Sequence, residues 1–203
     1  MNFATHNDMS DIAPHHRRSI RLAGYEYSQA GAYFVTICTH QKRPVFGRVV
    51  DDGMQRNVYG EMVRDCWLAI SDHFPHVVVD EWIVMPNHMH GIVVITDDTQ
   101  PKSPVGAGFP RPPHESHPES NSAQSRAGKP RPYEATLGQI VGYFKYQSTK
   151  RINQYRAERD LPPVRVWQRN YYERIIRDET ELNDTRRYII ENPANWATDE
   201  NHP

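Results

Sequence analysis

Two histidines, His88 and His90, interrupt an apolar run that is typical of a β-strand. Side chains two residues apart in a strand point to the same face, so the two imidazoles are expected to project together, with Met89 on the other face. Neutral imidazoles are good ligands for a divalent transition ion, and a nearby oxygen would widen the choice to magnesium or manganese. Taken alone, an H-x-H pair is more often two half-exposed histidines at a strand edge. A metal site therefore needs a further ligand.

Tyr188 and Asn192 offer such a ligand together with a nucleophile. They are four residues apart in a segment expected to be helical, which puts the phenol and the carboxamide on one helix face. Asparagine supplies a hard oxygen ligand and tyrosine can form covalent intermediates, but a phenol with a pKa of about 10 must be activated by a metal or a base. The alternative is a half-buried aromatic residue and a helix C-cap before Pro193. Tyr171 and Tyr172 are rival nucleophiles, which we interpret as packing or base-stacking residues.

The formal net charge is only -1, but the basic residues are concentrated in one part of the chain. Residues 129–177 hold eleven basic and four acidic side chains, a local charge of +7, with aromatic rings interleaved. Cations that neutralise phosphates and rings that stack on unpaired bases are the two components of single-strand binding. A solvated helix face is the competing interpretation. The expected DNA-binding residues, including two from the N-terminal segment, are Arg17, Arg18, Lys145, Lys150, Arg151, Trp167, Arg169, Tyr171, Tyr172, Arg174 and Arg177.

Strand and helix patterns alternate along the chain. Strands are expected at 31–40, 76–86 and 88–96, a turn or hairpin around Asp52 and Gly53, and an extended piece at 164–178 that turns helical near its end. Helices are expected at 54–73, within 136–156 with Thr136 as the N-cap, and within 179–196, where the helix stops at Asn192-Pro193. This mixture predicts an α+β fold with helices packed on an antiparallel sheet.

The chain divides into a basic, irregular N-terminal arm (1–28), a single domain (29–196) and a tail (197–203). A Pro/Ser/Gly-rich stretch at about 97–133 has almost nothing to bury and is expected to be a flexible insertion in the domain. No apolar run is long enough to span a bilayer, and the start lacks the apolar core of a signal peptide. The two cysteines make no disulfide framework by their spacing. We therefore expect a cytoplasmic protein that does not contact a membrane.

Several stretches together resemble a known family. The stretch "WIVMPNHMHGIVVI" looks like the HUH motif, histidine–hydrophobe–histidine, of single-tyrosine transposases that act on single-stranded DNA. The stretches "RRSIRLAGYEYSQAGAYFVTICTH", "VWQRNYYERIIRD" and "RRYIIENPANW" resemble the branch called REP-associated tyrosine transposases. The resemblance runs from about residue 17 to residue 196, interrupted by the insertion.

This resemblance implies a fold, a site and an activity. The fold is the HUH endonuclease fold, a ferredoxin-like antiparallel sheet with helices on one side. His88 and His90 match the metal-binding pair, Tyr188 matches the nucleophile, and Asn192 matches the third ligand of a divalent ion, magnesium or manganese. The implied activity is cleavage and rejoining of single-stranded DNA at a hairpin through a 5′-phosphotyrosine. Separately, we expect the protein to be nucleoid-associated and to be either a monomer or a homodimer.

Other functions compete with this strand transferase. A domesticated protein that binds palindromic hairpins and rarely cuts them would keep the basic aromatic surface but has no need of a nucleophile. A replication or mobilisation nickase uses the same chemistry, usually within a larger chain. The presence of His88, His90, Tyr188 and Asn192 together favours the enzyme.

Overall fold

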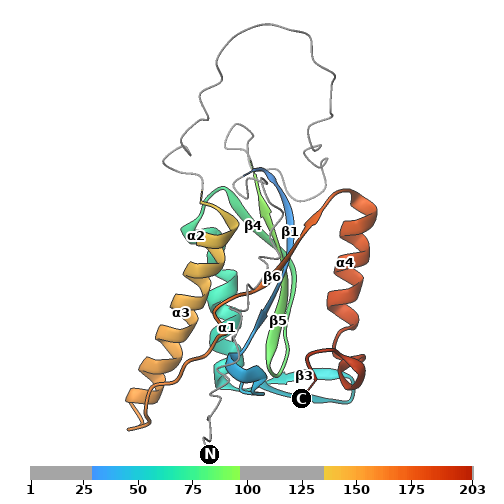
Figure 1. The fold of residues 1–203 in the computed structure, drawn as a ribbon. Helices are drawn as coiled ribbons and strands as arrows, with labels where there is room; N and C mark the ends of the chain where they lie inside the picture. The colour runs from blue at the N-terminus through green and yellow to red at the C-terminus, as the bar shows by residue number, and fades with distance from the viewer. Residues whose placement is uncertain (1–28, 97–134, 203) are drawn as a thin grey trace, which may run out of the picture.

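The computed structural model describes residues 29–96 and 135–202. Within these residues, four strands form an antiparallel sheet in the order β4-β5-β1-β6 (Figure 1). The strands are β1 (Gly31–Cys38), β4 (Val77–Val84), β5 (His88–Ile95) and β6 (Tyr172–Ile176). The central pair is β1 and β5, and β6 is an edge strand that pairs with β1. The N-terminal arm with Arg17 and Arg18, and the insertion, lie outside the described residues.

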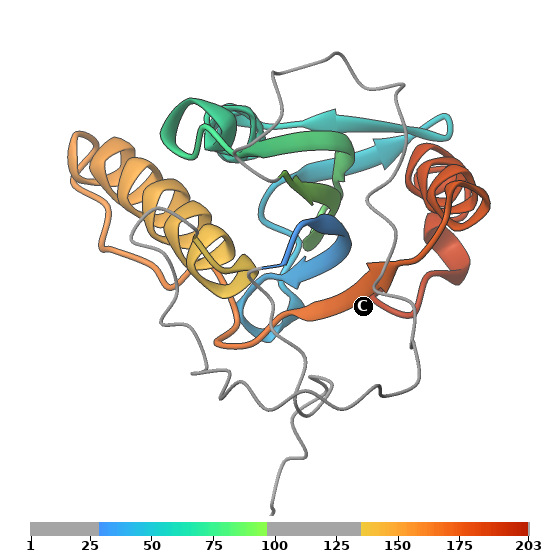
Figure 2. The ribbon, with the colours of Figure 1, turned by 90° about the horizontal axis from the view of Figure 1, so that it is seen from above.

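Helices cover both faces of this sheet, which confirms the α+β class but corrects the expectation of helices on one side. The helices are α1 (Val58–Leu68), α2 (Ile70–His73), α3 (Leu137–Ala157) and α4 (Glu179–Glu191). Figure 2 shows α1 and α3 on one side and α4 on the other. None of the described helices combines the length and apolar character needed to cross a membrane.

Helices pack on both faces of the sheet because the central strands carry apolar side chains on each face. From β1, Tyr33, Val35 and Ile37 belong to the larger core, which includes residues of α1 and α3. From the other face, Ala32 of β1 joins a smaller core with Leu182 of α4. Since successive side chains of a strand alternate between faces, this pattern leaves neither face to solvent.

Local chemistry sets the helix boundaries, and two expected boundaries were wrong. Thr136 caps α3 in a capping box with Gln139, as the sequence predicted at that position. The helix expected from residue 54 begins only at Val58, because Asn57 is its N-cap and β3 (Gly53–Arg56) pairs with β2 (Gly47–Val50). The extended piece at 164–178 does not become helical near its end. It remains a strand to Ile176, and α4 starts after its N-cap Asp178.

Gly91 lets α1 pack closely on the sheet. A Cβ at this position would lie 2.3 Å from Cζ2 of Trp67, a fully buried side chain of α1. The indole is also packed edge-on against Phe144 of α3, with ring centroids 5.2 Å apart, so it cannot move toward that ring. The close approach of α1 to β5 therefore depends on the missing side chain.

Replacing Gly91 by alanine should consequently destabilise the protein. We expect Gly91→Ala to lower the free energy of unfolding by roughly 1–3 kcal/mol through overpacking. Gly142→Ala is the matched control, because no atom lies within 4 Å of a Cβ at this exposed position of α3. It should stabilise the helix by roughly 0.5–1 kcal/mol. Urea unfolding of both variants measures the difference, and equal effects would contradict this packing.

Candidate active site

His88 and His90 lie side by side at the start of β5 and point to the face that α4 covers. Their cross-strand partners in β1 are Cys38 and Thr36. The shared face agrees with the period-two prediction. The two side chains are 0% and 2% exposed, however, so they are not the half-exposed pair that an isolated H-x-H suggests.

Hydrogen bonds on the Nδ1 atoms orient both imidazoles. His88 Nδ1 lies 2.8 Å from Asn87 Oδ1, and His90 Nδ1 lies 2.9 Å from Thr36 Oγ1. Asn87 uses its amide nitrogen to donate to the carbonyls of Lys42 and Asn201, so its oxygen is the atom that faces His88. That oxygen can only accept, and His88 Nδ1 therefore carries the proton and leaves Nε2 with a free lone pair.

The two Nε2 atoms face each other at 3.0 Å. Burial lowers the pKa of His88 to about 4, and burial together with the neighbouring His88 lowers the pKa of His90 well below its usual value. Both imidazoles are therefore neutral at physiological pH. Two neutral nitrogens this close need either a shared proton or a cation between them. Fixed Nδ1 atoms and convergent Nε2 atoms are the arrangement of histidine metal ligands.

Two further residues, Asp199 and Asn192, carry oxygen atoms that could act as ligands. A carboxylate oxygen of Asp199 and the ring nitrogens of His88 and His90 all lie within 4.8 Å of one another. Asn192, the C-cap of α4, donates from Nδ2 to Asp199 Oδ2 at 3.2 Å. Its Oδ1 is buried and accepts no hydrogen bond from residues 29–96 or 135–202. Asn192 is thus both the helix cap of the alternative interpretation and a possible ligand.

The sequence analysis missed Asp199 because this residue was assigned to the tail. Residues 199–202 instead pack against the end of the sheet. The carbonyl of Asn201 accepts from Asn87 at 2.6 Å, and Lys42 donates to the carbonyl of Glu200 at 3.0 Å. In the sequence, Asp199 is marked only by its place seven residues after Asn192, which is a weak sign of a ligand. It lies near His88 and His90 because the segment after α4 folds back toward them.

Tyr188 lies beside the histidines, on the solvent side. It is 45% exposed, and its hydroxyl oxygen is 3.4 Å from His90 Nε2. Its ring packs edge-on against Phe34, whose ring in turn stacks on His90. Partial burial and the charges of Asp199 and Glu200 raise the pKa of Tyr188, so the phenol is protonated unless a positive charge is close by.

A salt bridge holds α4 against the sheet two residues before Tyr188. Arg186 donates to both carboxylate oxygens of Asp80 in β4, at 2.8 and 2.5 Å. Although burial favours the neutral acid, these hydrogen bonds keep the pKa of Asp80 below its usual value. A bidentate pair of this kind fixes orientation as well as distance. Arg186 therefore positions the helix that carries the phenol.

Two of the expected DNA-binding residues flank this site. In β6, Tyr172 pairs with Thr36 and Arg174 pairs with Phe34, so both lie on the face of the histidines. The guanidinium of Arg174 lies 5.8 Å from the centre of the Phe34 ring and donates to Thr185 of α4. Tyr172 is largely exposed. Tyr171 points to the other face, where it packs against the larger core.

Other expected contacts have different roles in the structure. Trp167 is only 4% exposed and donates to Ser148 Oγ, so its ring faces are not free to stack on DNA. Lys145 donates to the carbonyls of residues 168, 169 and 170, which uses all three of its protons and leaves none for a phosphate. Arg151 pairs with Asp65 at 3.1 Å. Lys150, Arg169 and Arg177 are exposed.

The buried imidazoles make stability depend on pH. An unfolded histidine binds a proton with a pKa of 6.5, whereas burial holds the pKa of His88 at about 4 and that of His90 well below 6.5. Below pH 6.5 the unfolded chain therefore binds more protons than the folded one, and the free energy of unfolding falls as the pH drops toward 4. We expect the double variant His88→Gln/His90→Gln to lose this part of the pH dependence in urea unfolding. An unchanged pH dependence would contradict neutral, buried imidazoles.

One known protein is similar in sequence to nearly the whole chain. No protein-family model matches the chain. An uncharacterized protein from Haemophilus influenzae is 38% identical over 186 residues, which cover 92% of this chain and 93% of that protein.

Solved structures resemble the chain in fold. The structure of a REP-associated tyrosine transposase bound to a REP hairpin matches with a TM-score of 0.50 and 16% identity, over 89% of this chain and 77% of that one. A candidate transposase from Deinococcus radiodurans matches more distantly, with a TM-score of 0.43 and 15% identity over 83% and 94% of the two chains. The chain thus belongs to the family of the Haemophilus influenzae protein and has the fold of a transposase.

Proposed function

We propose that this chain is a metal-dependent endonuclease and strand transferase that acts on single-stranded DNA at hairpins. The observation that carries the proposal is the hydroxyl of Tyr188, 3.4 Å from an imidazole whose Nε2 already faces a second imidazole. A protein that only binds hairpins has no physical need for this arrangement. The fold neighbour bound to a REP hairpin supports hairpin DNA as the substrate class.

The residues at the site fit a divalent cation. His88 and His90 offer two neutral nitrogens, Asp199 offers a carboxylate, and the buried Oδ1 of Asn192 has no other partner among the described residues. A mixed nitrogen and oxygen set suits manganese and related ions, and magnesium less well than an all-oxygen set. When bound, such an ion supplies positive charge next to the scissile phosphate.

Tyr188 is then the nucleophile of the cleavage step. Its phenolic oxygen forms a bond to phosphorus while the bond from phosphorus to the 3′-oxygen breaks, and the phenolic proton ends on the released 3′-hydroxyl. The products are a 5′-phosphotyrosine and a free 3′-hydroxyl. Attack by another 3′-hydroxyl reverses the step and rejoins the strand. One phosphodiester replaces another throughout, so no external energy source is required.

Covalent trapping tests this reaction. A labelled single-stranded hairpin incubated with the protein and manganese should give an adduct that survives a denaturing gel. Tyr188→Phe should abolish it, because the nucleophilic oxygen is lost. Tyr172→Phe is the matched control, since it removes the hydroxyl of the rival tyrosine that shares the face of the histidines, and it should still form the adduct.

The other outcomes identify the alternatives. An adduct that persists in Tyr188→Phe and disappears in Tyr172→Phe would assign the nucleophile to β6. Tight binding of the hairpin without an adduct in the presence of manganese or magnesium would favour the domesticated palindrome-binding protein.

Metal binding can be measured without any reaction. Titration calorimetry with manganese should show one site in the wild-type protein, and Asp199→Asn should weaken it by at least roughly 10-fold, because loss of even an outer-shell partner typically costs that much. Asn192→Ala should weaken it as well, because it removes the buried oxygen. Glu200→Gln is the matched control, as it removes the adjacent carboxylate, which is not part of the ligand group. Equal affinities of wild type and Asp199→Asn would remove Asp199 from the site.

A further inference from the structure

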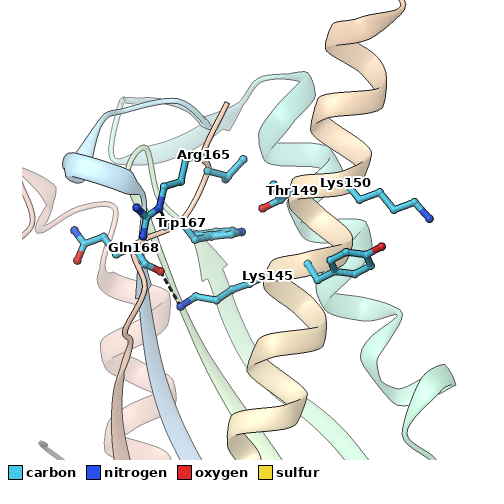
Figure 3. A pocket seen from close by; sticks show the side chains of 8 residues that line it. Lys145, Thr149, Lys150, Arg165, Trp167 and Gln168 are labelled. Atoms are coloured by element: carbon cyan, nitrogen blue, oxygen red, sulfur yellow. Dashed lines mark hydrogen bonds between the residues drawn. The ribbon is translucent and has the colours of Figure 1, made fainter. Parts of the chain in front are cut away.

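Lys145 of α3 binds three successive backbone carbonyls in the segment just before β6. Its Nζ donates to the carbonyl oxygens of Gln168, Arg169 and Asn170, at 3.0, 3.2 and 3.1 Å. Figure 3 shows the side chain reaching from the helix to the carbonyl of Gln168. An ammonium group has three protons to donate and no lone pair, so three acceptors match it fully. Lys145 is therefore a fixed internal cation for the segment 168–170.

This segment lies where the pairing between β1 and the chain leading into β6 changes register. Thr39 bridges to Trp167, whereas Thr36, three residues earlier, pairs with Tyr172, five residues after Trp167. The β6 side therefore carries two extra residues between these two pairs. Extra residues of this kind form a bulge, which bends a strand and changes the direction of the side chains that follow. The three carbonyls that Lys145 binds belong to this bulge.

The register after the bulge decides which β6 side chains face the histidines. Tyr172 and Arg174 lie on the histidine face, and a slip of one residue would turn both of them to the opposite face. The guanidinium of Arg174 lies 5.8 Å from the centre of the Phe34 ring. That ring packs against His90 and Tyr188. A change of register would thus remove a positive charge from the edge of the tyrosine site.

Few other contacts fix the register of β6. It is an edge strand of five residues, and among the described strands it pairs with β1 alone. A strand with one partner is free to slip unless its connections or its packing specify the register. Burial lowers the pKa of Lys145 to about 8, so the ammonium form predominates at pH 7. Without Lys145, three successive backbone acceptors would lose their shared donor at once.

We propose that the ammonium group of Lys145 is a positioning group for the tyrosine site. It fixes the bulge at 168–170, and the bulge places Tyr172 and Arg174 beside the histidines. Lys145 acts from the other side of the sheet, because α3 covers the face opposite α4 (Figure 2). The inference deepens the proposed function and rests on it for the part that concerns DNA cleavage.

Amide hydrogen exchange of Lys145→Ala tests the positioning of β6 without DNA. Peptides that cover residues 168–176 should exchange at least roughly 10-fold faster than in wild type, because hydrogen bonds to a charged group are lost. The pair of β4 and β5 should exchange as before. Propylammonium chloride should restore slow exchange, because it replaces the atoms lost beyond Cβ and can enter the pocket of about 350 Å³ that Lys145 lines. Tetramethylammonium chloride at the same concentration should not, because it has the charge but no N–H.

Two further variants are controls for this experiment. Lys145→Met keeps an unbranched side chain without a donor, so it should lose protection like Lys145→Ala, and propylammonium should not rescue it because no space is opened. Arg48→Ala removes an exposed cation of β2 and should leave the exchange of β6 unchanged. Unchanged exchange at 168–176 in both Lys145 variants, or equal rescue by the two ammonium salts, would overturn the proposal.

The rate of adduct formation separates this inference from the proposed function. With the labelled hairpin and manganese, Lys145→Ala should form the adduct roughly 10- to 100-fold more slowly, as expected for a small misplacement of groups near a reacting centre, and propylammonium should restore the rate. If both Lys145 variants lose protection of β6 but form the adduct at the wild-type rate, the positioning role is overturned and the proposed function stands. If wild type forms no adduct, the proposed function fails, and loss of protection with selective rescue still supports the placement of β6 by Lys145.

Discussion

The site depends on two neutral, buried imidazoles that face each other at 3.0 Å. Burial keeps both imidazoles uncharged, and Asn87 and Thr36 fix their orientation, so the two Nε2 atoms converge on one point. Such a pair either shares one N–H proton in a hydrogen bond or holds a cation between the nitrogens. The nearby carboxylate of Asp199 and the buried oxygen of Asn192 are suited to hold that charge. Because the pKa of Tyr188 is raised, its phenol also needs a nearby positive charge in order to ionise.

The fold brings these groups together from three segments, of which β5 is distant in sequence from the other two. Strand β5 carries the histidines, α4 carries the phenol under the control of the Asp80–Arg186 salt bridge, and the last residues return to supply Asp199. Asn87 links the parts, because it contacts His88 and the carbonyls of Lys42 and Asn201 at once. The larger core on the opposite face holds the sheet in shape without entering the site.

Sequence periodicity predicted the local part of this site and could not predict the rest. The spacing of His88 and His90 put both on one face, and the spacing of Tyr188 and Asn192 did the same on a helix. Asp199 could not be predicted, because its position depends on a non-periodic return of the chain. Counts of basic and aromatic residues also failed to distinguish exposed side chains from those that are buried or already bonded to other protein groups. Trp167 is in the core, and Lys145 is bound to carbonyls, although both contributed to the basic aromatic pattern.

The most direct test of the site is the position of the metal ion itself. Crystals grown with manganese should show one anomalous peak between the Nε2 atoms of His88 and His90, in contact with the carboxylate of Asp199 and next to the Tyr188 hydroxyl. The two nitrogens should move apart from 3.0 Å to admit the ion. An imidazole pair that keeps its direct contact at saturating manganese, with the peak elsewhere, would contradict the account.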